Sequence, residues 1–155
     1  MPNETTIFDF ETDFAGSLQC IPMAVRFKLD MSGVKVSLRQ WNRFSHEDRT
    51  QLLEQNCDIA TDITLYRESL IKLIRAIPDE PVFLPAEMDA AWADPSSVPV
   101  QIFDHACKVG IAPPSSEQWA ALSPLQRFTL IKLSRDHHDN VNFIPALREF
   151  GVLTI

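Results

Sequence analysis

One motif occurs twice in this chain, with a constant offset of 78 residues. Trp41, Ser45 and Arg49 return as Trp119, Ser123 and Arg127, and an apolar pair follows each copy at Leu52-Leu53 and Leu130-Ile131. Each copy also comes after a helix-like apolar segment that stops at a glycine, Gly33 or Gly110. The repeated residues are of the kind that build a scaffold, so the pattern predicts a duplicated all-helical fold.

We therefore expect an all-α protein in which residues 1–155 form a single compact domain with an internal duplication. The two helix–turn–helix halves span about 21–77 and 100–151, and a Pro-rich acidic connector, 78–99, joins them. A chain of 155 residues is long enough to bury a real core as one domain. We expect the halves to superpose by a pseudo-twofold, with Trp41 on Trp119.

The ends of the expected helices carry recognisable signals. Ser45 is expected to cap one helix, and Ser123 to cap another with Pro124 in its first turn and Gln126 completing a capping box. Apolar spacing predicts a helix over 61–77, capped by Thr61 or Asp62, and a further helix from about Asn142 to Gly151. We expect an extended segment at Ile7–Phe10 and a short helix within 86–93. Arg49 and Arg127 are expected to bind carbonyls at helix C-termini.

Charge and composition exclude several classes of protein. The net charge is −7, and the connector 78–99 has five acidic residues and no Lys or Arg. Nucleic-acid binding needs a clustered cationic face, which this balance does not offer, and an acidic protein partner is also disfavoured. No apolar run is long enough to span a membrane, and the N-terminus has no signal-peptide pattern. Three widely spaced cysteines are typical of reduced thiols in a cytoplasmic protein.

Two short segments hold residues that can bind metals. They are Asp104-His105-x-Cys107 and Arg135–Asp139, which contains His137 and His138. Neither has the spacing of a zinc or di-iron site, because adjacent residues on a helix point about 100° apart. No serine lies in a nucleophile elbow and no glycine-rich loop exists to hold a phosphate. We therefore expect no catalytic residues, no metal and no cofactor.

Several stretches together resemble one family. They are Phe8–Glu11, Leu18–Met23, Val25–Asp30, Leu122–Arg135 and His138–Gly151. On these residues the chain resembles the conserved nitrate reductase-associated proteins, small proteins known mainly from cyanobacteria and some proteobacteria. The connector matches least well, and Asp139 stands where the family pattern has Glu.

The resemblance implies a non-enzymatic accessory protein that is required for the activity, maturation or stability of an assimilatory molybdenum nitrate reductase. The implied partners are nitrate reductase or the machinery that inserts its molybdenum cofactor. The family supplies no catalytic residues to transfer. Two alternatives stay open: a small metal- or cofactor-binding enzyme using His105, Cys107, His137 or His138, and a helical interaction module unrelated to nitrate.

A partner-binding surface is expected at the polar run 135–142. Its candidate residues are Arg135, His137, His138, Asp139 and Asn142. The corresponding segment of the first repeat, 57–64, lacks both histidines and the arginine. This divergence between otherwise similar halves is what a functional surface added to one copy would produce. The alternative is an ordinary loop that caps a helix.

Overall fold

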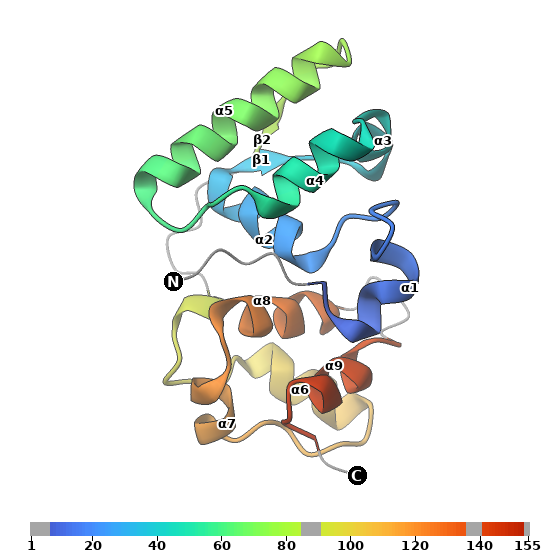
Figure 1. Ribbon diagram of the computed structural model, residues 1–155. Helices are drawn as coiled ribbons and strands as arrows, with labels where there is room; N and C mark the ends of the chain where they lie inside the picture. The colour runs from blue at the N-terminus through green and yellow to red at the C-terminus, as the bar shows by residue number, and fades with distance from the viewer. Residues whose placement is uncertain (1–6, 85–90, 136–140, 154–155) are drawn as a thin grey trace. The chain divides into compact units, whose positions relative to one another are not determined.

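The computed structural model describes residues 7–84, 91–135 and 141–153, and most of them are helical (Figure 1). The predicted all-α class is confirmed, with one small exception, a two-stranded ribbon. The chain divides into two compact units, Met1–Ala86 and Glu87–Ile155. The prediction that the whole chain forms a single domain stays a prediction.

The first unit holds the longest helix and the ribbon. Its elements are η1 (Asp9–Glu11), α1 (Thr12–Ala15), α2 (Met23–Ser32), β1 (Val34–Lys35), α3 (Leu38–Arg43), α4 (His46–Glu54), α5 (Ala60–Ala76) and β2 (Val82–Phe83). Helix α2 packs against α4 and α5, and the predicted apolar stripe of α5 buries Tyr66, Leu70 and Ile74. Gly33 ends α2 with φ of 71°, the left-handed conformation that favours glycine.

The second unit is built around α8. Its elements are η2 (Ala91–Ala93), α6 (Val100–Lys108), α7 (Ser116–Ala121), α8 (Pro124–Leu133) and α9 (Phe143–Glu149). Helix α8 contacts α6, α9 and η2. Six of its ten residues are buried, since it lies in the middle of this unit. Among the described helices of both units, none has the length and apolar character needed to cross a bilayer.

The predicted N-caps at Ser45 and Ser123 are confirmed. The Ser45 hydroxyl accepts a hydrogen bond from the Asp48 backbone N–H at 3.0 Å. Ser123 forms the full capping box, in which its hydroxyl accepts from Gln126 N and its own N–H donates to Gln126 Oε1. Two further boxes escaped the sequence analysis, at Ser37 before α3 and Ser115 before α7. They also lie 78 residues apart.

The repeated tryptophans have the structural role that the sequence predicts. Both are fully buried, and each indole N–H donates to the carbonyl of an earlier segment: Trp41 to Leu18 at 2.8 Å, and Trp119 to Asp94 at 3.1 Å. Each ring therefore makes the same kind of hydrogen bond. The superposition of the two halves by a pseudo-twofold stays a prediction.

The repeated arginines bind carbonyls where helices α3 and α7 end, as predicted. Arg49 donates to the carbonyl of Phe44, which is the residue after α3. Arg127 donates to the carbonyl of Leu122, the residue after α7, at 2.6 Å. Each guanidinium also reaches an earlier segment of its own unit, Leu18 for Arg49 and Trp92 for Arg127. These contacts tie irregular segments to the helices by charge-assisted hydrogen bonds.

Two local expectations were wrong. Residues 9–15 are helical rather than extended, and α5 begins after Ile59 with no side-chain cap from Thr61 or Asp62. The connector contributes strand β2, whose Val82 and Phe83 pair antiparallel with Lys35 and Val34. The short helix expected within 86–93 is a 3-10 turn at Ala91–Ala93 in its described part, and residues 85–90 lie outside the described residues.

Candidate functional site

Helix α6 carries a row of polar residues beside its buried face. The helix starts after Pro99 and buries Ile102, His105 and Ala106. Gln101, Asp104, His105 and Lys108 share the adjacent face, because residues three and four apart lie one above the other on a helix. Gln101, Asp104 and Lys108 are exposed, as polar residues beside the buried face of a helix usually are.

His105 is the buried centre of this row. Its side chain is 4 % exposed, and its ring packs edge-to-face against Phe143 of α9, with 4.6 Å between ring centroids. Neither imidazole nitrogen has a hydrogen-bond partner among the residues that the structure describes. Buried polar atoms in proteins are nearly always paired, so this imidazole, like Gln55 Oε1 and Thr129 Oγ1, is an exception among the described residues.

A cavity of about 160 Å³ lies beside the imidazole. It is lined by Gln101, Asp104, His105 and Lys108 of α6 and by Ser134, which follows α8. Gln101 Nε2 donates to the carbonyl of Ile131 at 3.4 Å and to Ser134 Oγ at 3.3 Å. Ser134 Oγ donates to the same carbonyl at 2.8 Å. The amide N–H groups of Gln101 and the hydroxyl proton of Ser134 are therefore used in hydrogen bonds at the C-terminal end of α8.

The expected partner-binding residues are only partly described. Arg135 is exposed directly after Ser134, and Asn142 is half-buried directly before α9. Asn142 makes no side-chain cap on that helix. His137, His138 and Asp139 lie outside the described residues. Whether these five residues form one surface stays a prediction.

The metal alternative gains no support from α6. His105 is buried whereas Cys107, two residues on, is exposed, so the two side chains point to different sides of the helix. In the described ranges 7–84, 91–135 and 141–153 there is no group of three His, Cys, Asp or Glu side chains that could hold a metal ion. The other two histidines of that alternative, His137 and His138, are not described.

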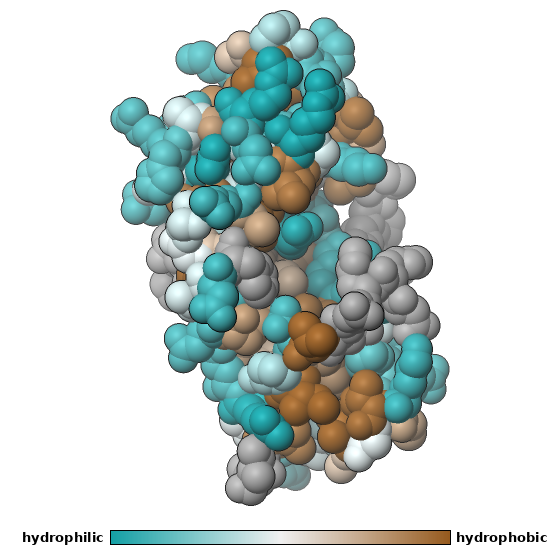
Figure 2. All heavy atoms as spheres, turned by 90° about the vertical axis from the view of Figure 1, so that its right-hand side faces the viewer, coloured by the Kyte–Doolittle hydropathy of each residue, from teal (hydrophilic) through white to brown (hydrophobic). Residues whose placement is uncertain are grey.

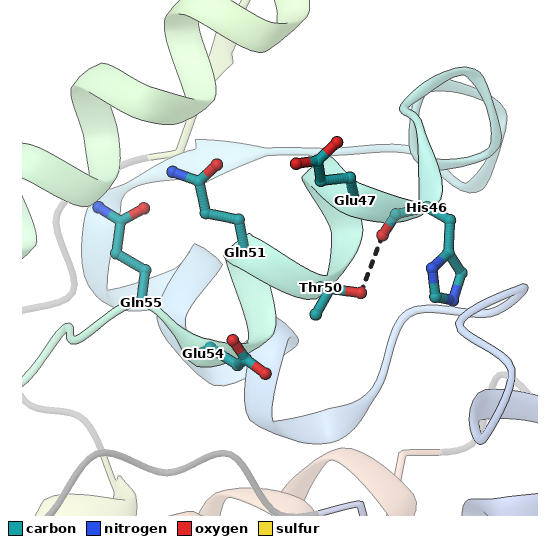
Figure 3. Close-up of a pocket in the computed structure, with 6 residues that line it drawn as sticks. All are labelled: His46, Glu47, Thr50, Gln51, Glu54 and Gln55. Carbon is teal, nitrogen blue, oxygen red and sulfur yellow. Dashed lines mark hydrogen bonds between the residues drawn. The ribbon is translucent and has the colours of Figure 1, made fainter.

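A wider hollow lies along α4 in the first unit (Figure 3). Its six lining residues all come from α4 and the residue after it: His46, Glu47, Thr50, Gln51, Glu54 and Gln55. Their side chains point away from one helix rather than toward a common point, and the hydrogen bond drawn there, from Thr50 Oγ1 to His46 O, is internal to the helix. This arrangement is a solvated polar helix face.

The shifted pKa values of the described residues have structural causes. Burial raises the pKa of the Cys57 thiol to about 12, the opposite of what a nucleophilic cysteine requires. Burial also lowers the pKa of the Arg127 guanidinium. Hydrogen bonds from Ser96, first its hydroxyl and then its backbone N–H, hold the pKa of Asp94 below its usual value. None of these groups lines the cavity beside His105.

The family of conserved nitrate reductase-associated proteins matches residues 7–150. The chain belongs to this family. The match covers both units and confirms the resemblance found in the sequence. No curated protein and no solved structure matches the chain. The family's description associates its members with nitrate reductase.

Sequence reasoning singled out His105 but missed Gln101, Lys108 and Ser134. The signal was available in part, because Gln101, Asp104, His105 and Lys108 follow the i, i+3, i+4, i+7 spacing of a single helix face. The ligand motif Asp104-His105-x-Cys107 includes only two residues of this row. Ser134 carries no such signal, since it reaches the cavity only through the packing of α8 against α6.

Proposed function

We propose that this protein is a non-enzymatic accessory protein of an assimilatory molybdenum nitrate reductase, required for the enzyme's activity, maturation or stability. The observation that carries the proposal is membership of the nitrate reductase-associated family over residues 7–150. The proposed partner is nitrate reductase itself or the machinery that inserts its cofactor, and the proposed location is the cytoplasm.

The chemistry of the described residues supports an accessory role rather than a catalytic one. Cys57 is buried with a raised pKa, and the hollow along α4 brings no side chains to a common point. The repeated elements of the motif, Trp41 and Trp119 with their arginines, donate their hydrogen bonds to backbone carbonyls. They build the scaffold and leave recognition to the surface.

The proposed contact surface is on the second unit, at residues 135–142. Arg135 is exposed, and the side chain of Asn142 does not cap α9. Figure 2 shows hydrophilic groups over much of one face and brown, apolar groups gathered in its lower part. The polar character of residues 135–142 supports a contact made through hydrogen bonds and charges.

The test has three arms. Deletion of the gene should lower nitrate reductase activity in cells grown on nitrate, and nitrate reductase or a cofactor-insertion protein should co-purify with the untagged protein. Replacing His137 and His138 together with alanine should weaken activation and leave the melting temperature nearly unchanged. His46→Ala is the matched control, because His46 is an exposed histidine on α4 in the first unit.

Each arm has an outcome that contradicts the proposal. Unchanged nitrate reductase activity after gene deletion would contradict the accessory role. Unchanged activation by the double alanine variant removes the histidines from the surface. A fall in stability that parallels the fall in activity returns them to a structural role in the loop.

A further inference from the structure

We draw no further inference here: the strongest candidate, the exposed apolar face of helix α6 formed by Val100, Phe103 and Cys107, carries none, because nothing in the structure shows what covers it.

Discussion

Replacing Ser123 with alanine isolates the contribution of one capping box to stability. The Ser123 hydroxyl accepts from Gln126 N at 3.1 Å in a partly buried setting, and Gln126 Oε1 accepts from Ser123 N at 2.9 Å. Loss of an N-cap hydroxyl costs about 0.5–2 kcal/mol, and a partly buried, reciprocated cap belongs in the upper half of that range. We expect a loss of about 1–2 kcal/mol in the free energy of unfolding.

The first unit supplies a control in the same molecule. Ser45 accepts from Asp48 N in an exposed setting, and its cap is not a full box. Ser45→Ala should therefore cost about 0.5–1 kcal/mol, less than Ser123→Ala. For a chain of this length, 1 kcal/mol corresponds to a fall of about 2–4 °C in the melting temperature. Calorimetry and urea unfolding should both resolve the difference between the two variants.

A glycine variant separates capping from other causes. Glycine is tolerated at an N-cap and loses only a few tenths of a kcal/mol there, whereas inside a helix it is worse than alanine. Ser123→Gly should therefore be more stable than Ser123→Ala. An unchanged melting curve for the alanine variant, or a glycine variant less stable than the alanine one, would refute the assignment of Ser123 as a cap.

Three further predictions concern buried and hydrogen-bonded groups. Lys28→Met leaves two carbonyls at the end of α4 without their donor and should cost about 1–3 kcal/mol in urea unfolding; an unchanged midpoint would contradict this role. Exposed Cys107 should react with a thiol reagent in the native protein, while Cys57, with its pKa raised to about 12, should react only on unfolding; equal rates would contradict its burial. The pKa of Asp94 is lowered by hydrogen bonds from Ser96, so its carboxylate stabilises the fold above the unfolded pKa of about 3.9, and this contribution is lost as pH falls through the lower folded value. Asp94→Asn should make stability less sensitive to acid, and an unchanged pH profile would contradict the linkage.

Much of the candidate site depends on contacts that no local pattern specifies. Asp104 and His105 stand out in the sequence as a possible ligand pair, yet the metal reading of that pair gains no support from the described residues. Gln101 and Ser134 join the site only because α6 packs against α8. The partner-binding run 135–142 stays a prediction, with Arg135 exposed and the histidines outside the described residues.

The sequence alone determined the class of the fold and the ends of several helices. Ser45, Ser123 and Gly33 act within one helical turn, so their roles can be read from neighbouring residues. The repeated Trp and Arg positions also indicate a structural role, because the same spacing occurs twice. Family membership follows from the same residues, since a match over 7–150 is a property of the sequence.

Tertiary structure decided what local signals leave open. Strands β1 and β2 contribute two residues each and pair across almost fifty residues of chain, so they have no periodicity to reveal them. The same holds for two buried polar groups: Lys28 donates to two carbonyls at the end of α4, whereas His105 has both ring nitrogens unpaired within the described residues. Whether a buried polar group is hydrogen-bonded depends on whether another helix places a carbonyl within reach of it. Only the packing of the helices decides this.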